Sequence, residues 1–204
     1  MKEIKDKKLL EKYYKSVQCY FSVKPKVIKL IEYKKGELLN SPLNELDTFL
    51  IVVKGKISIY DISYDGAIRY ISLASKDALL GDVEFCGKIH QSFYTEATSS
   101  LICLSIPFKE NKEILENDPV FLRFVLNKLT DKLFFSAKLE SSSQTLEERV
   151  LFYLQKVTPN HKLTSINETL KILHCSRRQL QRVLKKLCDS NILVKEGRGN
   201  YKLK

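Results

Sequence analysis

Hydrophobic residues recur along the chain with two different spacings, which predict two kinds of secondary structure. Between residues 27 and 106 they occur in short runs rich in β-branched and aromatic residues, separated by turns that contain Gly or Asp. Such runs are typical of the strands of a compact antiparallel sandwich or barrel. The sharpest hairpin signal is Asp65-Gly66, a dipeptide that favours a tight turn. Strands are expected within the segments VIKLIEY, TFLIVVKGKISIY, AIRYISLA and SSLICLSI.

Helical spacing is found on both sides of this β-rich region. Residues 3–16 carry apolar side chains among charges at helix-like intervals, which predicts a short amphipathic helix. A long helix is expected to begin after Asp118, with Asp118 as its cap and Pro119 in its first turn. Its narrow apolar stripe is close to a heptad seam along which two copies can pair, and packing against the β-rich region is the alternative. The stripe consists of Leu122, Val125, Leu126, Leu129, Leu133 and Ala137.

A polar interruption at residues 141–144, with the sequence SSSQ, separates the long helix from the apolar-periodic stretch LEERVLFYLQKV. Thr145 and Glu148 have the spacing of a capping box, which predicts a new helix after the interruption. The domain boundary is therefore expected at this point. The predicted organisation is a β-rich domain at 1–117, a long helix with a hinge at 118–143 and a small C-terminal domain at 144–204.

Two short helices are predicted inside the C-terminal domain. Ser165 and Glu168 form a second capping box ahead of a helix at about 165–173, and Ser176 is placed to cap the next helix. Only two residues, His174 and Cys175, separate them. This matches the turn of a helix-turn-helix, whose second helix enters the major groove of DNA. The second helix has apolar residues on one face: Leu180, Val183, Leu184 and Leu187.

The opposite face of this second helix is cationic and polar. Arg and Gln side chains can pair two groups with a guanine or adenine edge, whereas Lys mainly contacts phosphates. A solvated surface helix would instead carry interspersed acids in i, i+4 pairs, and no Asp or Glu occurs between residues 177 and 188. The pattern therefore favours DNA binding. The face consists of Arg177, Arg178, Gln181, Arg182 and Lys185.

After the second helix, the segments ILVKE, GRGN and YKLK predict two short strands around a Gly-rich turn that exposes Arg198. Directly behind a recognition-like helix, this pattern indicates the wing of a winged helix, with its turn against the phosphate backbone. An ordinary β-hairpin is the alternative.

The positive charge of the chain is concentrated in the C-terminal domain. Residues 144–204 contain 13 Lys/Arg and 5 Asp/Glu, whereas residues 1–143 contain 22 and 19. Phosphate contacts are therefore expected for the small domain and a different task for the large one. A generally lysine-rich composition is the alternative, but it does not explain the asymmetry.

The composition, with 44% apolar and 29% charged residues, indicates a globular protein. No run approaches the ~20 apolar residues of a membrane-spanning helix, and the N-terminus lacks the pattern of a secretory signal. We therefore expect a cytoplasmic protein without a membrane partner. Five cysteines without a CxxC pair indicate neither a disulfide framework nor a zinc site. Reduced thiols in small apolar niches are expected at Cys19, Cys86, Cys103, Cys175 and Cys188.

Together these segments resemble the Crp/Fnr superfamily of bacterial transcription regulators over nearly the whole chain. KKGELL and IVVKGKISIYDISYDGAIRYISLA resemble its cyclic-nucleotide-binding-like β-roll, and LLGDVEF resembles its effector cassette. LEERVLFYL resembles the segment that leads into the winged helix, and CSRRQLQRVLKKLCDSNILVKEGRG resembles the DNA-binding core. The resemblance implies an α+β fold: an antiparallel β-roll with flanking helices, a long dimerisation helix and a C-terminal winged helix-turn-helix.

The same resemblance implies an effector pocket, but this chain departs from its nucleotide-binding form. There, a Gly-Glu pair holds the ribose and an Arg-Ser pair the phosphate; this chain has Gly81-Asp82 and Gln91-Ser92. Without the arginine, a buried cyclic phosphate loses its main charge partner. The adenine-contacting pair aligns with Phe134-Phe135, which either fill the core or line an apolar ligand site. Cyclic AMP is therefore not expected as a ligand, no cofactor is predicted, and the identity of any effector stays open.

Other sensor types of the superfamily need residues that this sequence mostly lacks. Iron–sulfur members have an N-terminal cysteine cluster, where this chain has Cys19, and a haem sensor needs axial ligands, for which the β-rich region offers His90. Cys86 beside the cassette is expected to be structural, with a thiol switch as the alternative.

Arg178 stands where many relatives have Glu, which should change the preferred operator. Leu170 replaces a residue that is usually small.

The sequence thus predicts a homodimeric, sequence-specific transcription regulator and not an enzyme. Its partner is double-stranded DNA with an inverted-repeat operator, and RNA polymerase is a further candidate partner. An effector-independent regulator with a filled β-roll is one alternative. A cupin-like metal enzyme is another, although His90 alone provides too few metal ligands. The residues expected at the DNA are Ser165, Ser176, Arg177, Arg178, Gln181, Arg182, Lys185 and Arg198.

Overall fold

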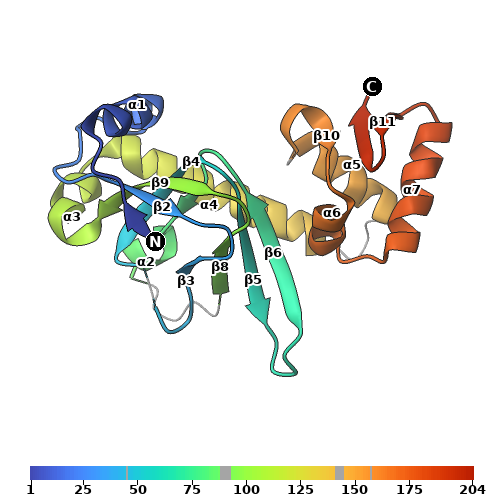
Figure 1. Cartoon of the computed structure of the whole chain (residues 1–204), viewed down its shortest axis with the longest axis horizontal. Helices are drawn as coiled ribbons and strands as arrows, with labels where there is room; N and C mark the ends of the chain where they lie inside the picture. Colours follow the sequence, from blue (N-terminus) through green and yellow to red (C-terminus); the bar gives the residue numbers. More distant parts are fainter. Residues whose placement is uncertain (45, 88–92, 141–144, 157) are drawn as a thin grey trace. The chain divides into compact units, whose positions relative to one another are not determined.

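The computed structural model describes residues 1–44, 46–87, 93–140, 145–156 and 158–204. The chain forms two compact units, Met1–Leu133 and Phe134–Lys204. The N-terminal unit contains two antiparallel sheets with flanking helices, and the C-terminal unit contains helices and a small sheet (Figure 1). The long helix α4 (Pro119–Glu140) begins in the first unit and ends in the second.

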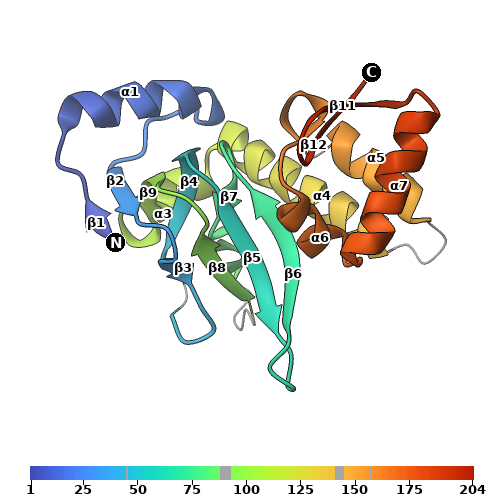
Figure 2. The same ribbon diagram turned by 45° about the vertical axis from the view of Figure 1, so that its right-hand side comes forward.

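The two sheets of the N-terminal unit confirm the predicted antiparallel β-roll. The first sheet has the strand order β1-β2-β9-β4-β7 and the second has the order β3-β8-β5-β6 (Figure 2). Their strands are β1 (Lys2–Glu3), β2 (Lys29–Tyr33), β3 (Leu38–Asn40), β4 (Thr48–Lys54), β5 (Ile57–Ile62), β6 (Ile68–Ala74), β7 (Leu79–Leu80), β8 (Phe93–Ala97) and β9 (Leu101–Pro107).

The hairpin between β5 and β6 turns at Asp65-Gly66, as predicted. Gly66 has a left-handed backbone (φ 80°), which its missing side chain allows without strain. The Asp65 carboxylate accepts a hydrogen bond from the Ala67 N–H (3.1 Å), and the Ser63 carbonyl accepts one from the Gly66 N–H (2.8 Å). Local side-chain chemistry therefore sets this turn.

Two hydrophobic clusters cover the two faces of the first sheet. One includes Phe49 of β4, Leu104 of β9 and Phe121 of α4, so it joins the sheet to the helices. The other includes Leu50 of β4 and Ile57 of β5, so it fills the space between the two sheets. Strand β4 contributes alternate residues to the two clusters, so both of its faces are buried. Its sequence is therefore a continuous apolar run.

The N-terminal helix is shorter than predicted from residues 3–16. Helix α1 (Lys7–Val17) begins after Asp6, whose carboxylate accepts a hydrogen bond from the Leu9 N–H (3.0 Å). Residues Lys2 and Glu3 instead form β1, which pairs with β2. The prediction is wrong for Glu3, because backbone pairing with a distant strand overrides the helical pattern. None of the helices in the described part of the chain is both long and apolar enough to cross a membrane.

The sequence pattern did not indicate several short elements, namely β3, β7, β8, η1 (Gln18–Tyr20), α2 (Asp82–Phe85) and α3 (Phe108–Glu116). The buried side chain of Asn111 fixes α3 to the segment before β2. It donates hydrogen bonds to the carbonyls of Val27 (3.0 Å) and Pro107 (2.8 Å) and accepts one from the Val27 N–H (3.1 Å). These contacts satisfy a buried amide that would otherwise be destabilising.

Asp118 joins the segment after α1 to the start of α4, and it is only 3% exposed. One carboxylate oxygen accepts hydrogen bonds from the Val120 and Phe121 N–H groups (2.9 and 3.1 Å) and from the Ser22 hydroxyl (2.7 Å). The other accepts from the N–H groups of Ser22 (2.7 Å) and Val23 (3.2 Å). Burial raises the pKa of Asp118, but these hydrogen bonds outweigh it and lower the pKa below its usual value of 3.8. The predicted cap is confirmed, and it also anchors a distant segment.

We expect Asp118→Asn to lower the free energy of unfolding by about 2–4 kcal/mol, because the amide turns one acceptor into a donor that faces other donors. Since the pKa of Asp118 is lower in the folded chain than in the unfolded chain, its carboxylate contributes fully to the free energy of unfolding above the unfolded pKa. This contribution is lost as the pH falls through the folded pKa. Urea unfolding followed by far-UV circular dichroism, at pH 7 and below about pH 4, measures both effects.

Asp6→Asn is the matched control, because Asp6 caps α1 at an exposed position. We expect it to lower the free energy of unfolding by no more than about 1 kcal/mol. Equal effects of the two substitutions would show that Asp118 acts only as a helix cap.

Candidate nucleic-acid interface

The C-terminal unit forms a helix-turn-helix from α6 (Ile166–Leu173) and α7 (Arg177–Asp189) (Figure 1). The Ser165 hydroxyl caps α6 by accepting a hydrogen bond from the Glu168 N–H (3.2 Å), and α6 ends at His174 with a left-handed backbone. The Ser176 hydroxyl accepts from the Gln179 N–H (3.2 Å), while the Gln179 side chain accepts from the Ser176 N–H (2.9 Å). Both helices therefore begin next to their predicted caps.

Helix α7 has one buried and one exposed side. Leu180, Leu184 and Leu187 are fully buried, and Val183 is half-buried. Burial of each leucine stabilises the unit by about 1.5–3 kcal/mol, so these side chains fix which side of the helix faces outward. The structure exposes every residue of the predicted cationic face, namely Arg177, Arg178, Gln181, Arg182 and Lys185.

Helix α5 (Leu146–Lys156) contacts both helices of the helix-turn-helix. Lys186 of α7 forms an ion pair with Glu147 of α5 (2.5 Å). Arg149 of α5 donates a hydrogen bond to the Leu173 carbonyl (3.0 Å), one of the carbonyls that the end of α6 leaves without an intrahelical partner. These contacts hold α5, α6 and α7 as one unit.

The start of α5 has the predicted capping box. The Glu148 carboxylate accepts hydrogen bonds from the Thr145 N–H (2.7 Å) and the Thr145 hydroxyl (3.0 Å). These hydrogen bonds lower the pKa of Glu148. The polar interruption at 141–144, where the hinge was predicted, lies outside the described residues.

One cation of the face is held by a neighbouring side chain. The Arg177 guanidinium donates a hydrogen bond to the Oδ1 atom of Asn167 (2.6 Å), and both residues are exposed. Asn167 lies near the start of α6 and Arg177 is the first residue of α7. Asn167 is not among the residues predicted from the sequence, because a contact between residues ten positions apart across a turn has no fixed motif.

The predicted wing consists of β11 (Leu193–Gly197) and β12 (Asn200–Leu203), in a sheet of order β10-β12-β11 with β10 (Lys162–Leu163). Gly199 in the turn has a positive φ of 79°, and Arg198 beside it is exposed. Lys162 pairs with Glu196 (2.6 Å) and lowers the pKa of that carboxyl. The negative charge of Glu196 is thus neutralised next to the turn.

The residues predicted for the effector cassette lie where β7 meets α2. A side chain at Gly81 would place its Cβ 2.4 Å from the Thr48 carbonyl oxygen, and Gly81 has φ +90°, so only glycine fits. Asp82 is 2% exposed and accepts two hydrogen bonds from the Lys132 ammonium of α4 (2.8 and 2.6 Å). Lys132 also donates to the Leu79 carbonyl (3.1 Å). The cassette carboxylate is therefore paired within the chain.

Two further residues predicted for the pocket, Gln91 and Ser92, lie outside the described residues, as does His90. The rings of Phe134 and Phe135 contact the ring of Phe152 on α5, with centroid distances of 5.9 and 6.2 Å. No sequence motif identifies Lys132 as the partner of Asp82, because the two residues are fifty positions apart.

The apolar stripe of α4 divides between the core and the surface. Val125 is buried in the core of the N-terminal unit, Leu129 packs against that core and Leu122 is half-buried. Leu126 and Leu133 are 63% and 72% exposed. Packing against the β-roll therefore explains why Val125 and Leu129 are apolar. It does not explain Leu126 and Leu133, which lie at the surface of the single chain.

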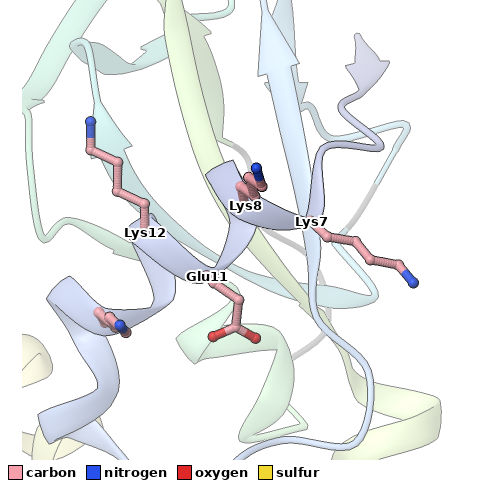
Figure 3. Close-up of a pocket in the computed structure, with 5 residues that line it drawn as sticks. Lys7, Lys8, Glu11 and Lys12 are labelled. Atoms are coloured by element: carbon pink, nitrogen blue, oxygen red, sulfur yellow. The ribbon is translucent and has the colours of Figure 1, made fainter.

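Helix α1 carries a second basic surface, formed by Lys7, Lys8, Lys12 and Lys15 around Glu11. Figure 3 shows the Lys7 and Lys12 side chains extending in different directions, with Glu11 on another side of the helix. Because these ammonium groups diverge and are exposed, they do not converge on one ligand.

The cysteines are all free, but they do not share one environment. The expectation of an apolar niche is confirmed for Cys103, whose burial raises its pKa to about 12. It is wrong for Cys19 and Cys86, which are exposed. Cys175 and Cys188 are half-buried.

Comparison with known proteins gives a consistent result. Residues 30–118 match the family described as cyclic nucleotide-binding domain. The Regulatory protein YeiL of Escherichia coli O157:H7 is 22% identical over 151 residues, which covers 72% of this chain and 69% of YeiL. The structure of FixK2 from Bradyrhizobium japonicum has a TM-score of 0.71 at 16% identity and covers 87% of this chain and 93% of FixK2. TTHB099, a CRP-family transcriptional regulator from Thermus thermophilus, has a TM-score of 0.63 at 16% identity, with 85% of this chain and 91% of TTHB099 covered.

The family match covers the β-roll, and each structural match covers most of this chain. The relatives that are named by function are regulators and not enzymes, so they give no support to a cupin-like metal enzyme. The resemblance found in the sequence is confirmed at the level of the fold. Residues 30–118 thus match a cyclic nucleotide-binding domain, and the chain has the fold of the Crp/Fnr-family transcription regulators.

Proposed function

We propose that this chain is a sequence-specific, DNA-binding transcription regulator of the Crp/Fnr type, with α7 as the helix that enters the major groove. The two-sided character of α7 carries the proposal. Its leucines are fully buried, while five cationic or amide side chains face solvent on the other side. A helix anchored in this way presents Arg and Gln groups that match the edges of guanine and adenine.

Different residues of the unit take different roles in this proposal. Arg177, Arg178, Gln181 and Arg182 read bases, because they lie on the exposed side of α7. The remaining residues lie near phosphates and position the unit, and Ser165 and Ser176 do so at helix N-termini, which favour anions. These phosphate residues are Ser165, Ser176, Lys185 and Arg198.

A homodimer is part of the same proposal. Leu126 and Leu133 are seven residues apart, so they lie on one face of α4 two turns apart, and both are exposed. Pairing of this face between two copies covers leucines that a single chain leaves in water. Two recognition helices related by a two-fold axis then meet half-sites about 34 Å apart in an inverted repeat.

Gating by cyclic AMP is not part of the proposal. The carboxylate at the position that resembles the ribose-binding site is almost fully buried, and Lys132 occupies both of its oxygens. A ribose hydroxyl that replaced this ammonium would leave a buried charge without its ion-pair partner. An effector-independent regulator is the second candidate, because buried apolar side chains fill the space between the two sheets.

Alanine substitutions at Arg178 and Arg182 should reduce sequence selectivity. We expect each to weaken binding to a duplex selected by the wild-type chain by about 10- to 100-fold, because each removes a base contact. Binding to random duplex should change much less. Fluorescence anisotropy with both duplexes at fixed salt concentration measures the ratio of the affinity for the selected duplex to the affinity for the random duplex.

Two controls separate base reading from general attraction to phosphates. Lys185→Ala should weaken binding to all duplexes similarly. It should also reduce, by about 1, the steepness with which the logarithm of the binding constant falls with the logarithm of the salt concentration. Gln155→Ala changes an exposed amide on α5 and should have no effect. If the Arg178 and Arg182 variants weakened every duplex equally, the assignment as base readers would be wrong.

The double substitution Leu126→Asp and Leu133→Asp should convert the dimer to a monomer at micromolar concentration, because it places charges opposite each other on the pairing face. Size-exclusion chromatography with light scattering measures the mass. Leu43→Asp is the control, since Leu43 is a fully exposed leucine outside α4. A wild-type chain that is monomeric at these concentrations would refute the dimer.

Cyclic AMP at millimolar concentration should neither raise the melting temperature of the chain nor give a saturable heat in calorimetry. The physical reason is that the Asp82 carboxylate is already paired with Lys132. Saturable binding at micromolar nucleotide would contradict this proposal. A melting-temperature screen against other metabolites separates an effector-independent regulator from one gated by a different ligand.

A further inference from the structure

The hydrogen bond between Asn167 and Arg177 links the two helices of the helix-turn-helix on their exposed side. Its length of 2.6 Å is that of a strong, charge-assisted hydrogen bond. Asn167 occupies the second position of α6, after the cap at Ser165, and Arg177 the first position of α7. Both backbones are fixed by their helices, so the hydrogen bond restrains the side chain of Arg177.

The other three proposed base readers lack such a restraint. Within the part of the chain that the structure describes, Arg178, Gln181 and Arg182 form no hydrogen bond through their side chains. A free Arg side chain loses rotamer entropy when it is fixed against a base. For Arg177 the protein has already restricted part of this freedom before any ligand binds.

The hydrogen bond leaves most of the guanidinium available. Arg177 has five N–H donors and Asn167 Oδ1 accepts one of them, so the others remain for an external acceptor. Asn167 uses its Oδ1 for this hydrogen bond, so its Nδ2 group keeps two N–H donors near the start of α6, where anions are favoured. The pair thus offers donors to a duplex and withdraws none of the positive charge.

We propose that Asn167 is a positioning residue that sets base selectivity through Arg177. The amide holds the guanidinium in one orientation, so that one base edge is recognised with little further ordering. This inference rests on the proposed function, because it requires DNA as the ligand. It adds a specificity-determining residue on α6, outside the helix that reads the bases.

The test uses the full-length chain, a duplex selected by the wild-type chain from a randomised library, and a random duplex. Asn167→Ala should reduce the ratio of the two affinities by about tenfold, whereas the affinity for the random duplex changes less than about twofold. Asn167→Asp keeps an acceptor for Arg177 and should retain most of the ratio, although its charge weakens binding to both duplexes. Gln155→Ala is the neutral control, and circular dichroism confirms that each variant is folded.

A double-mutant cycle shows whether Asn167 acts through Arg177. In the Arg177→Ala background, Asn167→Ala should change the ratio by less than about twofold, because the guanidinium that it positions is absent. Full additivity of the two substitutions, or an unchanged ratio for Asn167→Ala alone, would overturn the inference. A wild-type chain without any preference for the selected duplex would instead refute the proposed function itself.

Discussion

The arrangement of the C-terminal unit depends on the burial of Leu180, Leu184 and Leu187. These side chains leave α7 one stable orientation, because turning the helix over would expose them and bury several guanidinium groups. An unpaired charge in an apolar core costs several kcal/mol, far more than one leucine contributes. The exposure of the cationic face is therefore a consequence of the core, and the contacts from α5 through Glu147 and Arg149 reinforce it.

The same electrostatic constraint shapes the N-terminal unit. Asp82 and Asp118 are both almost fully buried, and each is stabilised by several donors from other parts of the chain. Asp118 attaches the start of α4 to the segment after α1, and Asp82 attaches α4 to the β-roll through Lys132. The helix is thus held at two points. This attachment fixes which of its residues enter the core, such as Val125, and which remain exposed, such as Leu126.

Local features were predictable because they depend on residues close in sequence. Each helix cap accepts a hydrogen bond from an N–H group a few residues further along the chain, as at Asp118, Thr145, Ser165 and Ser176. The turn at Asp65-Gly66 likewise depends on residues within the turn itself. Short strands such as β1 and β8 were not predictable, because a strand of a few residues is defined by its partner. Glu3, for example, fits the helical pattern of residues 3–16, but in the folded chain it pairs with Ile31 of β2.

Spacing and caps were sufficient to establish the order of the β-rich and helical regions, the starts of the helices and the two faces of α7. They were sufficient because they depend on residues that are only a few positions apart in the sequence. Three further features emerge only in the folded chain: Lys132 neutralises Asp82, Asn167 holds Arg177, and α4 divides its apolar stripe between core and surface. Such contacts depend on how separate elements meet, and that follows from the packing of the whole unit.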